Sequence, residues 1–358
     1  MNISNWIKLI ALGSVLVLPC AGAVVAADFT DTLDKPAIQT EKALQGNFTG
    51  LTAAGERLVA VGQRGHIFYS DDVGMRWQQA QVPVSSDLVA VHFPTPLQGW
   101  AVGHDGVVLH SRDAGQTWSR QFDGRQVGPV MLAYYQQLAA AQPEDSELPM
   151  RVAEARRMIE EGADKPFLDV WFESDRVGYI VGAFNLIFRT DDGGQTWTPW
   201  LDRTDNPSAL NLYALRPVGN ELFIVGEQGL MLKLDPAAGR FKAIATPYNG
   251  TFFGITGKPG AVLVFGLRGN AYRSVDGGTS WSRVELGLPL SITASSVTAD
   301  GRMVLLSQSG HVLLSDDDGA SFKLQPQNGL APVAAATVSS SGSLVLVGAR
   351  GLRQLPLE

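Results

Sequence analysis

The sequence contains little cysteine, no long apolar segment and no excess of basic residues. Cys20 is the only cysteine among 358 residues, so no disulfide can form within the chain. The apolar run from Leu9 to Leu18 is about ten residues long, whereas a membrane-spanning helix needs about 20. The 35 acidic residues outnumber the 28 basic ones, which argues against nucleic-acid binding, because that function favours a basic domain.

The N-terminal residues have the features of a secretory signal. Lys8 is the only charged residue before Asp28, the apolar run follows it, and small residues end at Ala27. We therefore expect residues 1–27 to be a signal peptide that is removed, and the remaining chain to be exported to the periplasm. Any association with a membrane would then come through a partner, because no other segment is long enough to span a bilayer.

Cys20 allows an alternative interpretation as a lipid-attachment site. Pro19 disfavours it, because a small residue is expected at that position. Cleavage near Ala27 removes Cys20, so the mature chain has no thiol and must be held together by its core. It also removes Lys8, which leaves 27 of the 28 basic residues against 35 acidic ones.

One pattern, Ser/Thr-x-Asp-x-Gly-x-x-Trp after a valine–glycine step, recurs along the chain. The step places a glycine, or once a serine, at seven positions: Gly62, Gly103, Gly182, Gly226, Gly266, Ser307 and Gly348. The successive intervals are 41, 79, 44, 40, 41 and 41 residues, and the outlier equals one period plus 38 inserted residues. Seven copies of a unit of about 41 residues predict a β-propeller, whose usual period is about 40–45.

The second unit shows how one blade is built. Residues 88–93 and 99–103 predict the first two strands, residues 106–111 the third, and the outer strand starts at Trp118. We therefore predict an all-β fold over residues 28–358, a seven-bladed β-propeller of four-stranded antiparallel blades.

The recurring acidic turn is predicted to be structural. Its Asp can accept hydrogen bonds from turn amides, its Gly permits a positive φ, and its Trp buries a large surface at the blade edge. The residues in these roles are Asp72, Asp113, Asp192, Asp276, Asp317, Trp77, Trp118, Trp197 and Trp281.

Two segments depart from the repeat. The last copy stops at Glu358 without a fourth strand, so we expect residues 35–40 to close the last blade as its outer strand. Residues 126–163 are an insert between blades two and three, with helical patterns that predict a hairpin. The hairpin either packs on the rim of the ring or docks a partner, and the two roles are compatible.

The repeats resemble the Asp box, or bacterial neuraminidase repeat. The longer pattern VGxxGxIxxSxDGGxxW is similar to the propeller family of photosystem II stability and assembly factors, which also has relatives in non-photosynthetic bacteria. The resemblance covers roughly residues 45–358 apart from the insert. It implies a non-catalytic binding scaffold that presents an arginine-rich face to an unassembled membrane subunit. Photosystem II would be the target if the organism is photosynthetic.

The turns between second and third strands predict where a partner binds. Arg64, Arg268 and Arg350 occupy one turn position in three units, and other turns contribute His104, Asp105 and Glu227. Clustered guanidiniums would suit a carboxylate or an acidic peptide. The alternative is that these are solvated turn arginines with no shared purpose. The partner would be a subunit of a membrane-embedded complex or a transporter, met on its periplasmic side by a monomer.

A sialidase-like glycoside hydrolase is the alternative function. It would need an arginine triad and a Tyr–Glu nucleophile pair, and seven units depart from the six blades usual for sialidases. The sequence shows neither a nucleophile elbow nor a phosphate-binding loop. The five histidines lack metal-ligand spacing: His66, His92, His104, His110 and His311. We therefore expect no catalytic residue, no metal and no cofactor.

Overall fold

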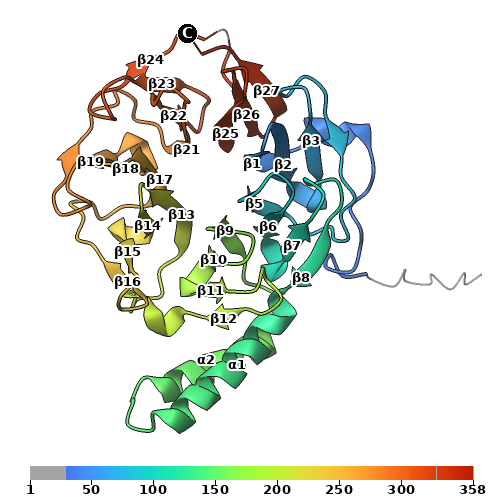
Figure 1. Cartoon of the computed structure of the whole chain (residues 1–358), viewed down its shortest axis with the longest axis vertical. Helices are drawn as coiled ribbons and strands as arrows, with labels where there is room; N and C mark the ends of the chain where they lie inside the picture. The colour runs from blue at the N-terminus through green and yellow to red at the C-terminus, as the bar shows by residue number, and fades with distance from the viewer. Residues whose placement is uncertain (1–29, 328, 358) are drawn as a thin grey trace, which may run out of the picture. The chain divides into compact units, whose positions relative to one another are not determined.

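The computed structural model describes residues 30–327 and 329–357, and residues 31–358 belong to one unit. Seven antiparallel sheets form a ring, and the strands of each sheet follow one another in chain order (Figure 1). The first strands of neighbouring sheets contact one another around the whole ring, including β1 with β25. The predicted seven-bladed propeller is confirmed. The predicted signal peptide, residues 1–27, lies outside the described residues.

Among the described residues, six blades have four strands and the seventh has three. The first three blades contain β1 (Phe48–Ala54), β2 (Arg57–Gly62), β3 (Ile67–Ser70), β4 (Gln78–Gln79), β5 (Leu88–His92), β6 (Gly99–Gly103), β7 (Val108–Ser111), β8 (Ser119–Phe122), β9 (Phe167–Phe172), β10 (Gly178–Gly182), β11 (Ile187–Thr190) and β12 (Thr198–Pro199). The next two contain β13 (Leu212–Val218), β14 (Glu221–Gly226), β15 (Met231–Asp235), β16 (Arg240–Ala243), β17 (Phe252–Lys258), β18 (Ala261–Gly266), β19 (Ala271–Ser274) and β20 (Ser282–Arg283). The last two contain β21 (Ile292–Val297), β22 (Met303–Ser307), β23 (Val312–Ser315), β24 (Lys323–Leu324), β25 (Ala335–Val338), β26 (Leu344–Gly348) and β27 (Gly351–Leu355).

The second strand of a blade lies in the core. In β6, β10 and β26 every residue is buried, because neighbouring blades cover both faces of the sheet. This explains why the valine–glycine step of the repeat is apolar rather than alternating. A strand buried on both faces reads as a continuous apolar run.

Each acidic turn between third and fourth strands is closed in the same way. The Asp Oδ1 accepts the backbone N–H four residues on, at 2.8 or 2.9 Å, and the hydroxyl two residues before it, at the same distances. That hydroxyl oxygen in turn accepts the N–H of the glycine two residues after the Asp. The five carboxylates are those of Asp72, Asp113, Asp192, Asp276 and Asp317. Each of these carboxylates therefore accepts hydrogen bonds within its own turn, as a structural role requires.

The indole N–H groups of the four tryptophans in these turns do not all donate to equivalent acceptors. The indole N–H of Trp77 donates to Gly74 O at 3.0 Å, and that of Trp118 donates to Gly115 O at 3.0 Å. Trp281 donates instead to Ala245 O at 3.1 Å, on the segment that joins blades four and five. The indole N–H of Trp197 is buried and has no hydrogen-bond partner among the described residues.

Two helices, α1 (Gly124–Ala141) and α2 (Leu148–Glu161), follow β8 in the chain and precede β9. The first begins at a capping box, in which the Asp123 carboxylate accepts the Arg125 N–H and the Gln126 side chain accepts the Asp123 N–H. Met131 and Tyr135 of α1 are fully buried among residues of blade three, and the Tyr135 hydroxyl donates to Asp202 at 3.1 Å. The remaining helices are short 3-10 turns: η1 (Glu41–Gln45), η2 (Gln63–Gly65), η3 (His104–Gly106), η4 (Ala183–Asn185), η5 (Leu201–Arg203), η6 (Glu227–Gly229) and η7 (Leu267–Gly269).

The expected route of residues 35–40 is wrong. The seventh sheet consists of β25, β26 and β27, and residues 35–40 are not part of it. They lie along blade one: the Ala37 N–H donates to Val82 O at 3.1 Å, and the Thr40 N–H to the Gln79 side chain at 2.8 Å. The prediction rested on the absence of a fourth strand from the last repeat. The side-chain amides of Gln39 and Gln79 instead hold residues 35–40 at the edge of blade one.

Blades one and seven are joined by apolar packing rather than by strand exchange. Phe48 and Phe68 of blade one form a cluster with Ala43 of η1 and Val347 of β26. The backbone adds one bond, from the Gly351 N–H to Gly46 O at 3.2 Å. Closure of the ring therefore involves η1 and its flanking residues together with the direct contacts of β1 with β25 and β26.

Candidate partner-binding face

The turns between second and third strands lie together at one end of the strands, and we call them the turn face: residues 63–65, 104–106, 183–185, 227–229, 267–269, 308–310 and 349–350. In five turns the middle residue has a φ between 51° and 58°, and Gly or Asn follows it, also with positive φ. Gly65 shows why glycine is favoured, because a Cβ there would lie 2.1 Å from Val84 O. The turn therefore fixes its backbone and directs the middle side chain outward.

The backbone of the turn face also ties neighbouring blades together. The Arg64 N–H donates to Asp87 Oδ1 at 2.7 Å, and Asp87 stands at the start of blade two. The Phe184 N–H donates in the same way to Asn211 Oδ1 at 2.8 Å, at the start of blade four. These bonds use the main chain of the middle residue and leave its side chain free.

The three predicted arginines are exposed. Arg64, Arg268 and Arg350 take part in no ion pair among the described residues. Arg64 and Arg350 belong to blades one and seven, which are adjacent in the ring. Arg268 belongs to blade five, and blade six separates it from Arg350. The structure thus brings two of the guanidiniums onto adjacent blades and keeps the third apart.

The two predicted acidic residues already have partners. Asp105 Oδ2 accepts the hydroxyls of Thr32, at 2.8 Å, and Ser86, at 2.6 Å. Glu227 accepts the Asn211 N–H at 2.9 Å and the Tyr213 hydroxyl at 3.3 Å. Both carboxylates therefore hold neighbouring segments in place. His104, in contrast, is exposed on the turn face.

Sequence reasoning missed an aromatic residue on the same face. Phe184 is 53% exposed and has a φ of 54°, at the turn position that carries arginine in three other blades. The Lys165 ammonium lies 5.6 Å from its ring centroid, within the range of a cation–π contact. The sequence does contain a signal for Phe184, because the repeat places it at an exposed turn position with positive φ, where packing does not explain a phenylalanine.

The helical hairpin adds a second apolar surface. Met150 and Ile159 of α2 are 61% and 44% exposed. Their neighbours on the helix include charged side chains that pair locally, such as Arg157 with Glu161 at 3.6 Å. The hairpin therefore combines a buried face toward blade three with isolated exposed apolar residues.

The centre of the ring holds a polar channel of about 350 Å³, lined by the first strands of the blades. Its one arginine among the lining residues is Arg216, whose guanidinium bonds the buried carboxylate of Asp169. Asp169 Oδ2 also accepts the Leu215 N–H at 2.7 Å. The charged groups of the channel therefore neutralise each other and join β9 to β13.

A Tyr–Glu contact is present at the channel wall, where the Tyr213 hydroxyl donates to Glu227 at 3.3 Å. Burial raises the pKa of Tyr213, and the Glu227 charge acts in the same direction. Among the described lining residues the channel has one arginine, Arg216, which is paired with Asp169, whereas a sialidase requires three.

Comparison with known proteins finds sequence matches over about half of the chain. The family model described as photosynthesis system II assembly factor YCF48 matches residues 39–129 and 148–246, over half of the chain. Photosystem II assembly protein Ycf48 of Synechococcus sp. (strain JA-2-3B'a(2-13)) is 26% identical over 181 residues, 46% of this chain and 52% of that protein. Photosystem II assembly lipoprotein Ycf48 of Synechococcus sp. (strain CC9902) is 27% identical over 186 residues, 51% of this chain and 44% of that protein. The match thus spans about half the length of these relatives.

A solved structure described as YCF48 bound to D1 peptide shares the fold. It superposes with a TM-score of 0.64 at 15% identity and covers 90% of this chain and all of that chain. At this identity the likeness establishes the fold alone.

Proposed function

Because the chain belongs to the photosynthesis system II assembly factor YCF48 family, we propose that it is a non-catalytic binding scaffold that assists the assembly of a membrane protein complex. The observation that supports this function most strongly is the set of exposed, unpaired guanidiniums on the turn face, within the part of the chain that the structure describes. Arg64 and Arg350 stand on adjacent blades, and Arg268 extends the positive charge to blade five. Guanidiniums in this state are suited to carboxylates of a partner.

The proposed ligand is an extended, acidic segment of a membrane protein subunit. One solved member of the fold was determined with a D1 peptide, which supports a peptide ligand by analogy. The carboxylates of the segment would lie over blades seven and one, beside Arg350 and Arg64. Its apolar side chains would contact Phe184 on blade three and the exposed residues of α2. Asp105 and Glu227 would support the face without touching the partner, since both are occupied.

We place this encounter in the periplasm. The signal-like N-terminal residues and the name of one relative, an assembly lipoprotein, support export. Among the described residues, no helix is both long and apolar enough to cross a membrane. The scaffold would then meet the exposed side of its membrane partner.

The test is photo-crosslinking capture from intact cells of the source organism, with identification of captured membrane proteins by mass spectrometry. The test variant carries Arg64→Glu, Arg268→Glu and Arg350→Glu. The matched control carries Lys242→Glu, Arg283→Glu and Lys323→Glu, which makes the same charge change on the exposed outer strands. The proposal expects one membrane protein to be captured by the native chain and the control and lost from the test variant. Equal capture by all three chains would refute the turn face as the interface.

A further inference from the structure

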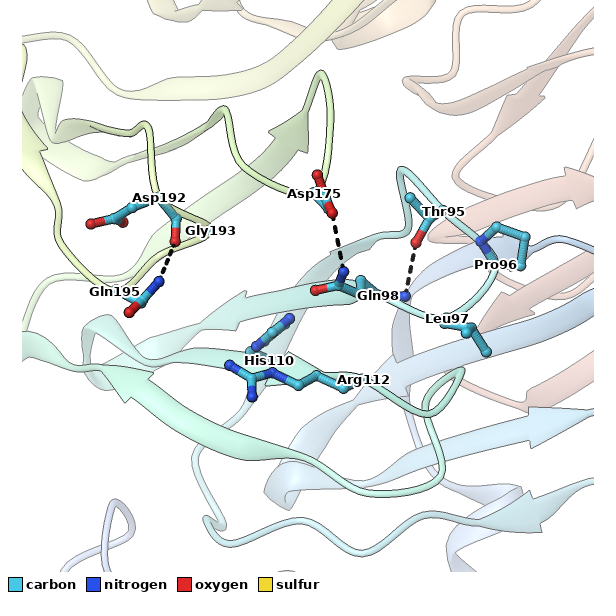
Figure 2. Close-up of a pocket in the computed structure, with 10 residues that line it drawn as sticks. All are labelled: Thr95, Pro96, Leu97, Gln98, His110, Arg112, Asp175, Asp192, Gly193 and Gln195. Carbon is cyan, nitrogen blue, oxygen red and sulfur yellow. Dashed lines mark hydrogen bonds between the residues drawn. The ribbon is translucent and has the colours of Figure 1, made fainter.

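A second polar site lies away from the turn face, where the first-to-second-strand loops of blades two and three meet the acidic turns (Figure 2). It is a pocket of about 720 Å³, within the range of about 300–1,000 Å³ usual for small-molecule sites. Leu97 and Gln98 line one side, Asp175 another, and His110 and Arg112 come from β7 and the residues that follow it. None of these residues takes part in the proposed partner contact.

The hydrogen bonds around His110 fix its tautomer. The Trp100 indole N–H can only donate, and it donates to Gln121 Oε1 at 2.9 Å. The amide nitrogen of Gln121 therefore faces the other way, toward Gly193 O at 3.0 Å and His110 Nδ1 at 3.3 Å. Because that nitrogen is a donor, Nδ1 of His110 must accept, and the ring proton resides on Nε2.

That Nε2–H group has no partner among the described residues. His110 is 4% exposed, its ring stacks on Trp100 with centroids 4.5 Å apart, and its Nε2 makes no hydrogen bond there. Burial, together with the neighbouring Arg112 charge, lowers the pKa of His110 to about 4, so the ring is neutral near pH 7. A buried donor left unsatisfied costs free energy, so a ligand group that accepts from Nε2–H would remove that cost.

Arg112 supplies the charge of the pocket. Its side chain is exposed and forms no ion pair among the described residues. The nearby carboxylates are otherwise engaged, since Asp175 accepts the Gln98 amide at 3.3 Å and Asp192 accepts the Thr196 N–H and hydroxyl of its own turn. Leu97, which is 60% exposed, adds an apolar wall. The pocket thus combines one cation, one neutral donor and one apolar surface with two carboxylates that are held by neutral donors.

We propose that this pocket binds a small organic monocarboxylate. One carboxylate oxygen would accept from the Arg112 guanidinium and the other from His110 Nε2–H, with the exposed Arg112 side chain shifting to admit it. The apolar part of the ligand would lie against Leu97. A phosphate dianion fits less well, because Asp175 and Asp192 stand near a single positive charge. A neutral amide would satisfy His110 but leave Arg112 without a counter-charge.

The test is NMR titration of the full chain, labelled with ¹⁵N in histidine, with three probes: benzoate, benzamide and inorganic phosphate. Benzoate is expected to shift the His110 Nε2 resonance in a saturable way, with benzamide and phosphate at least about tenfold weaker, as the loss of a charge-assisted hydrogen bond implies. Arg112→Gln should weaken benzoate about tenfold, whereas Arg283→Gln, an exposed arginine on β20, should leave its affinity unchanged.

Three results would overturn the proposal. Benzoate could produce no saturable shift, or it could bind Arg112→Gln as tightly as the native chain. Protonation of His110 at Nδ1, seen in the two-bond ¹⁵N couplings, would remove the donor on which the site depends. Arg112 is exposed, so its variant should fold. His110→Phe, which keeps the stack on Trp100, provides a second variant that should bind benzoate more weakly.

Discussion

The buried carboxylate of Asp169 is expected to contribute more to stability than any exposed ion pair of the chain. Asp169 is 2% exposed and accepts the Val170 N–H at 2.9 Å, the Leu215 N–H at 2.7 Å and the Arg216 guanidinium. Asp169→Ala removes the acceptor of the Leu215 amide and the counter-charge of Arg216, whose guanidinium keeps a bond to Leu215 O at 2.7 Å. Breaking a buried pair costs about 3–5 kcal/mol. The Arg216 side chain is 43% exposed to the channel, so water can replace part of the loss, and we expect about 2–4 kcal/mol.

The assay is urea unfolding followed by tryptophan fluorescence, together with thermal unfolding. At ~2.1 cal/mol/K per residue over ~330 residues, the unfolding entropy is ~0.7 kcal/mol/K, so the loss corresponds to about 3–6 °C in Tm. Asp191→Ala, which removes an exposed partner of Arg189, is the control and should change stability by less than about 0.5 kcal/mol. The double variant Asp169→Ala, Arg216→Met should lose at least about 1 kcal/mol less than the sum of the single variants. Strict additivity, or a loss as small as that of the control, would refute the reasoning.

Three further predictions concern the turns and the buried histidine. Gly65→Ala should destabilise by more than Gly239→Ala in urea unfolding, because both have positive φ but only a Cβ at Gly65 clashes with a carbonyl oxygen; equal losses would contradict the clash. The Ser280 hydroxyl and amide lower the pKa of Asp276 to about 2. Its contribution to the free energy of unfolding is therefore present above the ordinary carboxyl pKa and is lost as pH falls from about 4 to 2. Asp276→Asn should reduce this pH dependence of stability, measured by urea unfolding. Burial lowers the pKa of His110 to about 4, so the native chain should lose stability as pH falls from about 6.5 to 4, and His110→Phe should lose less.

The repeat made the fold predictable because each unit carries its own turn chemistry. The strands expected at 88–93 and 99–103 are β5 and β6, and the structure ends the first of them one residue earlier. The start of α1 was also readable, since Asp123 and Gln126 form a capping-box pattern ahead of the helical run. Local sequence therefore determined most of the architecture.

Features set by long-range contacts could not be predicted. Residues 35–40 follow blade one because of the Gln79 side chain, about 40 positions away in the sequence. The hydrogen bond that Asp105 accepts from Thr32 could not be predicted, because Thr32 lies outside the repeats. The unsatisfied Nε2 of His110 arises from a network that includes Gly193 of the next blade. In each case the pattern identifies the residue, and only the folded chain identifies its partner.

The turn face separates stability from recognition within a single residue. At Arg64 and Phe184 the backbone N–H joins neighbouring blades, while the side chain points to solvent. A change of side chain at this position therefore alters the surface of the ring without removing the backbone bond to the next blade. This explains how seven similar turns can carry arginine, aspartate, phenylalanine, glutamine and serine at one position. The result is an asymmetric face, with cations over blades five, seven and one and an aromatic ring over blade three, on a scaffold whose closure does not depend on them.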